Sequence, residues 1–437
     1  MGARQTALRV LIACRKEGAW SNSVLKTYLQ QDGLDRREAA LATRLCYGVL
    51  QNRLKLDFYL SQLLTGKLKD LHPVIRDILH LGLYQIYLSD KIPANAAVNE
   101  SVTLAKKNCK KQPFAPGLVN GVLRNAVRRA EEIKQPTTLQ DRYSHPQALI
   151  DLLIKAYGPE RVERMLKANN GAPQTVVQVN TLKTTQDALT EFLSKEGVEA
   201  KPHSWMENCL VLSSTGNLEN LESFQKGLYY VQDPAAKLSV LCAQIPHNAN
   251  VLDCCSAPGG KSFAAAMVLK GTGKIQSCDI YDHKIPLIQK GAERLGISNL
   301  TACRQEAEVF CPQWENKMDV VIADVPCSGY GIIRKKPDIR YKDPKDMEEL
   351  PALQRAILQN QSRYVKPGGT LVYSTCTLLP RENQEVVEGF LKKNPDFHLE
   401  KLSLPEAFPE NTTGMLTLLT GEYDTDGFFI CKLRRNQ

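Results

Sequence analysis

Two cysteines stand where a chain of alternating strands and helices would place a reactive side chain. Cys327 follows the β-prone run 319–324, and Cys376 follows the run 370–375. The carboxyl ends of parallel strands meet at one edge of a sheet, where ligands bind, so both thiols are expected at the same edge. A thiol in a polar turn can serve as a nucleophile once it loses its proton. Cysteine is more often a small core residue, but strand-end placement of both favours chemistry.

A loop of small residues follows a third predicted strand, at 251–253. It contains two glycines and leads into a predicted helix at 261–269. Glycine lets the backbone approach a ligand closely, and the start of a helix offers free N–H groups. The first glycine of the phosphate loop G-x-x-x-x-G-K-[ST] is missing, so the pattern indicates a cofactor loop of another kind.

An acidic residue, Asp279, ends the next predicted strand at 274–279, about 25 residues after the end of the strand at 251–253. At this position its carboxylate could accept hydrogen bonds from the hydroxyl groups of a ribose. A strand-end aspartate often only caps the following helix. Asp279 alone is therefore weak evidence for a ribose site, and the cofactor loop that precedes it strengthens that interpretation.

The composition is that of an ordinary globular protein. The chain has 437 residues, 43% hydrophobic and 24% charged, which is enough for two or three domains with their own cores. It has no run of about 18 apolar residues, so no membrane span is expected. Arg9, Arg15 and Lys16 interrupt the apolar residues of the first twenty positions, which argues against a signal peptide.

The thirteen cysteines include no C-x-x-C pair, which argues against a zinc module, so no metal is expected. Without an export signal the thiols are expected to be reduced, and the protein to be cytoplasmic. We also expect a monomer.

The positive charge is concentrated in the first third of the chain. Residues 1–135 contain 22 Lys and Arg against 11 Asp and Glu, whereas the rest of the chain contains 34 against 36. Such a basic surplus is typical of a protein that binds a polyanion. A well-solvated surface or cations at a helix end would explain part of it. The candidate RNA contacts are Lys106, Lys107, Lys110, Lys111, Arg124 and Arg128.

The hydrophobic pattern predicts three regions. Residues 1–135 are expected to be helical, because apolar residues such as those from Val119 to Val127 recur with helical spacing. A break near Gln135 leads into a small α+β segment at 140–235. From 236 to 437 strands and helices alternate, which predicts an α/β, doubly wound and mostly parallel sheet.

Three motifs taken together resemble one family. D-x-C-x-A-P-G-G-K begins at Asp253, D-x-P-C-S-G at Asp324, and S-T-C-T at Ser374. In this order and spacing they are similar to the RNA cytosine-5 methyltransferases of the NOL1/NOP2/Sun group, and within it to the bacterial enzymes that act on 16S ribosomal RNA. The region 39–124 resembles the NusB-like helical RNA-binding domain that such enzymes carry. The resemblance covers nearly the whole chain and implies a Rossmann-like methyltransferase domain at 236–437.

The resemblance implies a role for each matching residue. S-adenosyl-L-methionine would be the cofactor, Asp279 would hold its ribose, and Glu306 would lie near its adenine, although the family usually has aspartate there. Asp324 would lie between cofactor and base, Cys376 would be the nucleophile, and Cys327 the second thiol. Val325 replaces the more usual alanine. The residues expected to wrap the methionine part are Cys255, Ser256, Ala257, Pro258, Gly259, Gly260 and Lys261.

The implied mechanism follows from the chemistry of cytosine. Attack of a thiolate on carbon 6 makes carbon 5 electron-rich enough to accept a methyl group. Asp324, if protonated near the ring nitrogen, could stabilise the developing charge. Cys327 would assist the later expulsion of Cys376. The base must leave its stack to enter a pocket, so a loop or splayed nucleotide is the expected target.

Three alternatives stay open. The same chemistry could act on transfer RNA, or the chain could be a non-catalytic RNA-binding or antitermination-type factor. A DNA cytosine methyltransferase would use the cysteine after proline, here Cys327, as its nucleophile. The second strand-end cysteine, Cys376, favours the RNA arrangement.

Overall fold

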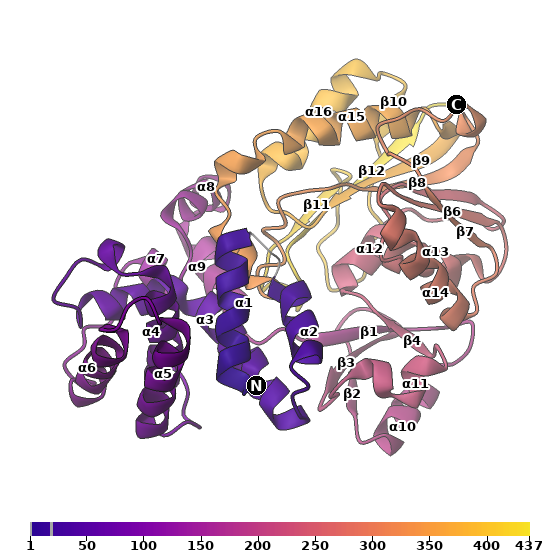
Figure 1. Ribbon diagram of the computed structural model, residues 1–437. Helices are drawn as coiled ribbons and strands as arrows, with labels where there is room; N and C mark the ends of the chain where they lie inside the picture. Colours follow the sequence, from indigo (N-terminus) through magenta and orange to yellow (C-terminus); the bar gives the residue numbers. More distant parts are fainter. Residues whose placement is uncertain (1, 18–20) are drawn as a thin grey trace. The chain divides into compact units, whose positions relative to one another are not determined.

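The computed structural model describes residues 2–17 and 21–437, which form two units (Figure 1). Unit 1 comprises Met1–Asn170 and Ile333–Asp343, and unit 2 comprises Gly171–Ile332 and Pro344–Gln437. The chain therefore enters unit 1 a second time, six residues after Cys327. Residues 1 and 18–20, which belong to the predicted first domain and to the stretch predicted to lack a signal peptide, lie outside the described residues.

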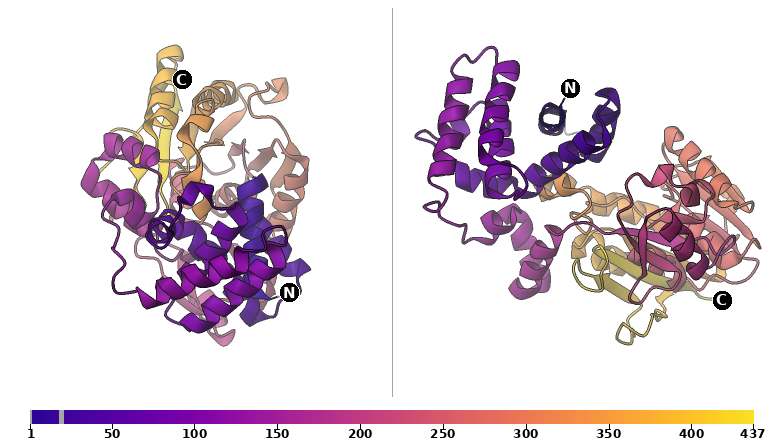
Figure 2. Two further views of the ribbon diagram at one scale, coloured as in Figure 1. Left: turned by 60° about the vertical axis from the view of Figure 1, so that its left-hand side comes forward. Right: turned by 90° about the horizontal axis from the view of Figure 1, so that it is seen from below.

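Unit 1 is helical, as predicted, and its helices enclose an apolar core (Figures 1 and 2). Predicted helices at 39–60, 74–88 and 94–105 are confirmed as α3, α4 and α5, and that around 119–127 as α6. The longer helices are α1 (Ala3–Glu17), α2 (Ser21–Gln31), α3 (Arg36–Ser61), α4 (Pro73–Tyr87), α5 (Ala94–Asn108), α6 (Ala115–Arg128), α8 (Gln147–Tyr157) and α9 (Pro159–Asn169); α7 is a short turn, Leu139–Tyr143.

The second passage through unit 1 fits into a kink of α3. Asn52 has non-helical backbone angles, which disturb the regular hydrogen bonds of the helix around it. The Leu54 N–H donates to Ser144 Oγ at 2.8 Å, and the Leu50 carbonyl accepts from the Tyr341 hydroxyl at 2.6 Å. Tyr341 ends the short helix η5, Pro337–Tyr341. Side chains thus form hydrogen bonds with two backbone groups beside the kink.

The first part of unit 2 is a four-stranded antiparallel sheet in the order β2-β3-β1-β4, covered by α10 (Gln186–Lys195) and α11 (Glu222–Gln225). The strands are β1 (Thr175–Val179), β2 (Glu199–Pro202), β3 (Cys209–Ser213) and β4 (Tyr229–Val231). The predicted α+β segment at 140–235 is divided between the units, because α7, α8 and α9 belong to unit 1. The three boundaries inferred from the sequence stay predictions.

The larger sheet of unit 2 has the order β10-β12-β9-β8-β5-β6-β7, with β11 paired to β12. The five strands from β9 to β7 are parallel, whereas β10, β11 and β12 run antiparallel, so the sheet is mixed. Its strands are β5 (Asn250–Asp253), β6 (Lys274–Asp279), β7 (Leu300–Arg304), β8 (Met318–Asp324), β9 (Val365–Thr375), β10 (Phe397–Leu399), β11 (Met415–Leu418) and β12 (Phe428–Arg435). The predicted fold class is confirmed.

Both faces of the larger sheet are covered, because successive strand residues point to opposite sides. Val320 and Ile322 pack on one face and Val321 and Ala323 on the other. Figure 1 shows α12, α13 and α14 against the first face and α15 and α16 against the second. These helices are α12 (Pro234–Cys242), α13 (Gly260–Leu269), α14 (Ile285–Leu295), α15 (Leu350–Ser362) and α16 (Gln384–Lys393). The carboxyl ends of the parallel strands open into a cavity.

Among the helices that the structure describes, none combines the length and apolar character that a membrane crossing requires.

Candidate active site

The two strand-end cysteines lie together. Cys327 follows β8 and Cys376 follows β9, which are neighbours in the sheet, and their sulfur atoms are 3.3 Å apart as free thiols. The hydrogen bond to Cys376, burial and the carboxylates of Glu382 and Asp324 hold the pKa of the Cys327 thiol well above its ordinary value. The two sulfurs are within hydrogen-bond distance of each other, and either can be the donor.

The turn at Cys376 is held by the backbone of two glycines. The Gly331 N–H donates to the Cys376 carbonyl at 2.9 Å, and the Gly427 N–H donates to the Gly331 carbonyl at 2.8 Å. A side chain at Gly331 would bring its Cβ to 2.0 Å from the Gly427 oxygen, so only glycine fits there. Two segments that are distant in the chain therefore meet beside Cys376, and their glycines allow the close approach.

Asp324, at the end of β8, accepts two hydrogen bonds. Lys261 Nζ lies 2.5 Å from its Oδ2, and Ser374 Oγ lies 2.8 Å from its Oδ1. Burial opposes the positive charge of Lys261, but the nearby carboxylates, Asp324 first, outweigh this and raise its pKa. The two side chains form an ion pair, and Lys261 also interacts with Cys376.

Another acidic residue, Asp253, is fully buried at the end of β5. Its Oδ2 accepts a hydrogen bond from Ser262 Oγ at 2.7 Å, and Ser262 in turn accepts from Ser277 Oγ at 2.6 Å. Burial raises the pKa of Asp253 to about 7. Its Oδ1 is buried and has no hydrogen-bond partner. Because Asp253 also lines a small cavity, this oxygen can receive a donor from a ligand.

A cavity of 410 Å³ lies at the carboxyl ends of the parallel strands and brings most of the predicted site together. The predicted residues that line it are Cys255, Ala257, Asp279, Glu306, Asp324, Cys327 and Cys376. An adjoining cavity of 170 Å³ is also lined by Cys255, Ala257 and Asp324, and adds Asp253, Ser256, Pro258, Gly260 and Lys261. Gly259 lines neither; its φ of 110° makes the turn into α13.

Asp279 also shapes the cofactor loop. Its carboxylate accepts from the Ala257 N–H at 3.3 Å and from the Tyr281 N–H at 3.1 Å, and Lys284 Nζ lies 3.6 Å away. Glu306 lines the same cavity but is much more exposed, and it lies 3.5 Å from Arg304. The structure thus gives Asp279 a fixed orientation, whereas Glu306 is held by one partly exposed ion pair.

The predicted RNA contacts are on two packed helices of unit 1, α5 and α6, and in the turn after α5. Lys106, Lys107, Lys110 and Lys111 are exposed, as are Arg124 and Arg128. Arg124 donates to Asn120 and Arg128 to Asn125, each to an amide oxygen of its own helix. Unit 2 brings together the predicted catalytic and cofactor residues, and unit 1 carries the predicted RNA contacts.

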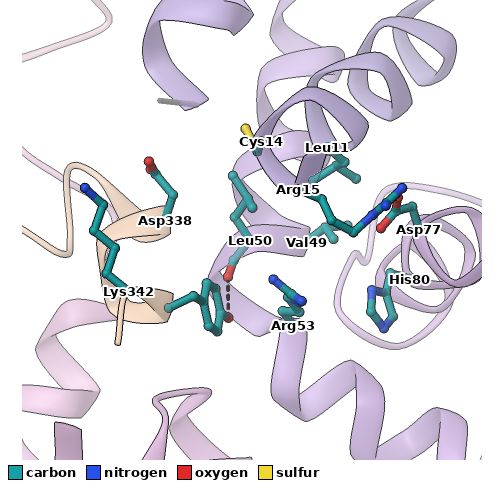
Figure 3. Close-up of a pocket in the computed structure, with 11 residues that line it drawn as sticks. Leu11, Cys14, Arg15, Val49, Leu50, Arg53, Asp77, His80, Asp338 and Lys342 are labelled. Atoms are coloured by element: carbon teal, nitrogen blue, oxygen red, sulfur yellow. Dashed lines mark hydrogen bonds and ion pairs between the residues drawn. The ribbon is translucent and has the colours of Figure 1, made fainter. Parts of the chain in front are cut away.

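A separate cavity of 270 Å³ lies in unit 1 (Figure 3). Arg15 and Asp77 form an ion pair at its wall, and Arg53 lies over the Tyr341 ring. Figure 3 shows Asp338 and Lys342 from the second passage of the chain on the side away from that ion pair. Its charges are of both signs, and none of the predicted site residues lines it.

The sequence reasoning missed several residues of the site. Ser374 donates a hydrogen bond to Asp324. It is the first residue of the S-T-C-T motif, so the motif could have identified it as part of the site. Glu382 and Asn383, in the turn after Cys376, hold both cysteine turns through hydrogen bonds. Nothing in the spacing of these two residues indicated contact with Cys327, which lies 55 residues away from Glu382 in the chain.

Within residues 2–17 and 21–437, no group of three or more His, Cys, Asp or Glu side chains is arranged to hold a metal ion.

Comparison with family models gives three consecutive matches. The model of the 16S rRNA methyltransferase RsmB/F matches residues 240–434, and that of the NusB family matches residues 1–128. The ferredoxin-like domain model of RsmF/B-like methyltransferases matches residues 145–219.

Full-length relatives are similar along the whole chain. The Bacillus subtilis protein named "Probable ribosomal RNA small subunit methyltransferase B" is 35% identical, over 99% of this chain and 98% of its own. Ribosomal RNA small subunit methyltransferase B of Vibrio cholerae is 34% identical, over 93% of this chain and 91% of its own. The crystal structure of PH0851 has the same fold, with a TM-score of 0.83 at 22% identity over 100% of this chain and 99% of that one.

Proposed function

Because this chain belongs to the family of 16S rRNA methyltransferases RsmB/F, we propose that it methylates carbon 5 of a cytosine in 16S ribosomal RNA through a covalent adduct with Cys376. The observation that supports this chemistry is the pair of thiols, 3.3 Å apart, beside an ammonium–carboxylate pair in one cavity. We also propose that the protein acts in the cytoplasm as a monomer.

S-adenosyl-L-methionine is the cofactor of this proposal, and when bound it supplies an electrophilic methyl group. A cavity of 410 Å³ is within the usual range for a ligand of this size, roughly 300–1,000 Å³. The carboxylates of Asp279 and Glu306 suit hydroxyl and amino groups of a nucleoside, and the unpartnered Asp253 Oδ1 suits the ammonium group of an amino acid. The residues present therefore fit the cofactor.

Cys376 is the proposed nucleophile. Its sulfur lies 3.3 Å from that of Cys327, and the positive charge of Lys261 is close enough to interact with it. Attack on carbon 6 forms a carbon–sulfur bond and moves electrons toward carbon 5, which then accepts the methyl group. Loss of the proton from carbon 5 and departure of the sulfur with its electron pair restore the ring. Cys327 can stabilise the departing sulfur by donating a hydrogen bond.

The ion pair refines the proposed role of Asp324. A protonated Asp324 near the ring nitrogen would require its contact with Lys261 to open, because both carboxylate oxygens already accept hydrogen bonds. We propose instead that Asp324, while paired with Lys261, accepts a hydrogen bond from the amino group of the base. Lys261 then provides the positive charge that stabilises negative charge developing on the ring.

Two alternatives to this proposal are the same reaction on transfer RNA and a non-catalytic RNA-binding role. The relatives named for the small ribosomal subunit favour 16S RNA over transfer RNA. The partly buried ion pair and the thiol pair disfavour a non-catalytic role, because removing charge from water is costly and would have no use in a binding factor.

The two cysteines should fail differently when each is replaced by alanine. Cys376→Ala should abolish both methyl transfer and covalent RNA–protein complexes. Cys327→Ala should still attack the base and then release RNA slowly, so that a complex accumulates and survives denaturing electrophoresis. The assay uses labelled 16S RNA fragments and labelled S-adenosyl-L-methionine, with transfer RNA as the alternative substrate.

Cys311→Ala is the matched control, because Cys311 is a half-buried thiol of unit 2 outside both cavities. It should retain activity. If Cys376→Ala trapped RNA and Cys327→Ala did not, the roles of the cysteines would be reversed, as in a DNA enzyme. Absence of any methyl transfer by the wild type on ribosomal or transfer RNA would favour the non-catalytic factor. Bisulfite sequencing of ribosomal RNA from a strain that lacks the protein would identify the nucleotide.

A further inference from the structure

Two adjacent residues after Cys376, Glu382 and Asn383, hold the turns of both cysteines. Glu382 Oε2 accepts a hydrogen bond from the backbone N–H of Ser328, the residue after Cys327, at 2.9 Å. Asn383 Oδ1 accepts from Thr375 Oγ1 at 2.6 Å, and its Nδ2 donates to the Thr377 carbonyl at 3.1 Å. Thr375 and Thr377 flank Cys376. One short turn thus fixes the separation of the two sulfurs from both sides.

The Cys327 turn has a second support. Gln354 Nε2, on α15, donates to Glu382 Oε2 at 3.0 Å and to the Pro326 carbonyl at 2.9 Å. Ser328 Oγ and Thr377 Oγ1, which lie 2.6 Å apart, connect the two turns directly. The residues on either side of Cys327 are therefore both held, and both supports meet at the carboxylate of Glu382.

The charge of Glu382 is not needed for these hydrogen bonds. Its side chain is fully buried, and among the described residues no cation forms an ion pair with it. Its Oε1 has no hydrogen-bond partner. A glutamine of the same shape would accept from Ser328 and Gln354 without the cost of burying an unpaired charge. A purely structural role therefore does not explain why the residue is a glutamate.

Cys327 lies in the field of that charge. The hydrogen bond to Cys376 is the largest cause of the raised pKa of Cys327, and burial and the negative charge of Glu382 act in the same direction. The charged or titratable groups around the two sulfurs are Asp324 from β8, Tyr373 from β9, Glu382 from the turn before α16, and Lys261 from α13. Lys261 is the one cation in this set and is paired with Asp324, so Glu382 is the acid left uncompensated.

We propose that Glu382 is a positioning residue whose buried carboxylate assigns the two cysteines different roles, holding Cys327 against the Cys376 sulfur as a thiol while Cys376 serves as the nucleophile. The inference rests on the proposed function, in which Cys376 attacks and Cys327 assists its departure. A negative charge beside Cys327 disfavours a second thiolate there. Two adjacent thiolates would repel each other and compete for the base.

The test uses Glu382→Gln, which keeps the hydrogen bonds and removes the charge, with Glu385→Gln as the matched control. Glu385 is exposed on the first turn of α16, three residues farther along the chain. Iodoacetamide modifies thiolates, and both cysteines line the 410 Å³ cavity, so the alkylation rate of each can be followed by peptide mass spectrometry without RNA. In Glu382→Gln the alkylation of Cys327 at pH 8 should be about tenfold faster, as expected for a pKa lowered by one unit.

The same variant should also change the reaction with RNA. Adducts that form through Cys327, absent in the wild type, should become detectable in a Glu382→Gln, Cys376→Ala double variant. Glu385→Gln should match the wild type in both assays. Equal alkylation of Cys327 in Glu382→Gln and the wild type would overturn the proposal.

A second variant, Glu382→Asp, keeps the charge and shortens the side chain. Slow alkylation of Cys327 in this variant, with fewer Cys376 adducts, would support the proposal. If both variants failed to fold, Glu382 would be a structural brace and the proposal would be wrong. The alkylation result does not depend on RNA, so it stands apart from the proposed function, which fails if the wild type transfers no methyl group.

Discussion

Two sites, one in each unit, hold their charged groups in different ways. In unit 1, Arg340 is fully buried, and its guanidinium donates only to neutral oxygens: the carbonyls of Gln51, Tyr143, Ser144 and Asn169 and the side chain of Asn170. At the strand ends of unit 2, a partly buried ion pair joins Lys261 and Asp324, and two buried acids, Asp253 and Glu382, each have an oxygen without a hydrogen-bond partner.

This difference separates a structural site from a chemical one. Burial lowers the pKa of Arg340 only to about 10, so the guanidinium stays charged at neutral pH, and it joins the ends of helices α7 and α9 to the kink of α3. The strand ends of unit 2 instead keep acceptor atoms available beside two thiols. Loss of charge should therefore cost stability in unit 1 and ligand binding or reactivity in unit 2.

The largest expected loss of stability is at Arg340. Arg340→Met keeps much of the side-chain volume but leaves several buried carbonyls without a donor, which should lower the free energy of unfolding by about 3 kcal/mol. Urea unfolding of the full chain measures this value. Arg37→Met is the control, because Arg37 is exposed on the first turn of α3, and it should change the value by less than about 0.5 kcal/mol. Equal losses in the two variants would remove the distinction between the units.

The next effect concerns binding rather than stability. Asp279→Ala should weaken the binding of S-adenosyl-L-methionine by roughly 1.5–3 kcal/mol, because the ribose loses a charged acceptor. Isothermal titration calorimetry measures the affinity, and RNA binding should not change. The control is Asp282→Ala, three residues farther along and mostly exposed. An Asp279→Ala protein that is folded and binds the cofactor normally would contradict the assignment.

Sequence reasoning predicted the parts of this molecule that depend on local pattern. Strands ending at Asp253, Asp279, Asp324 and Thr375 follow from short apolar runs, and their shared edge follows from parallel pairing. The antiparallel strands at the edge of the sheet did not follow, because pairing between β12 and β9 joins segments more than 50 residues apart.

Side-chain contacts between distant segments could not be predicted from the sequence pattern either. Arg340 binds Gln51, Tyr143 and Asn170, which lie 289, 197 and 170 residues away in the sequence. The kink of α3 is likewise completed by Tyr341 and Ser144. A helical pattern in the sequence predicts the helix, but side chains from elsewhere decide where its hydrogen bonds are replaced.

A smaller effect tests the open oxygen of Asp253. Its pKa of about 7 lies above the ordinary value of 3.8, so the folded protein retains a proton that the unfolded chain releases at lower pH. The free energy of unfolding should therefore fall as the pH rises from about 4 to 7. Asp253→Asn removes this titration and should stabilise the protein at pH 7, relative to the wild type, by on the order of 1 kcal/mol. Urea unfolding across this pH range measures the difference, and a parallel pH dependence in both proteins would contradict it.

The smallest effect for each residue is expected at four exposed lysines of unit 1, which have neither the neutral partners of Arg340 nor the ion pair of the active site. Lys106, Lys107, Lys110 and Lys111 are exposed, and no ion pair to them is seen in the described part of the chain. If they bind phosphates, replacing all four by alanine should weaken RNA binding and reduce the slope of log K against log salt by about 0.7–0.9 for each phosphate that is no longer neutralised. Cofactor affinity should not change.

The matched control replaces four exposed lysines of unit 2, Lys195, Lys201, Lys392 and Lys393, which removes the same charge from another part of the chain. Filter binding at several salt concentrations gives the slope. A slope that falls equally in both variants would show that net charge, rather than this stretch of unit 1, governs the affinity for RNA.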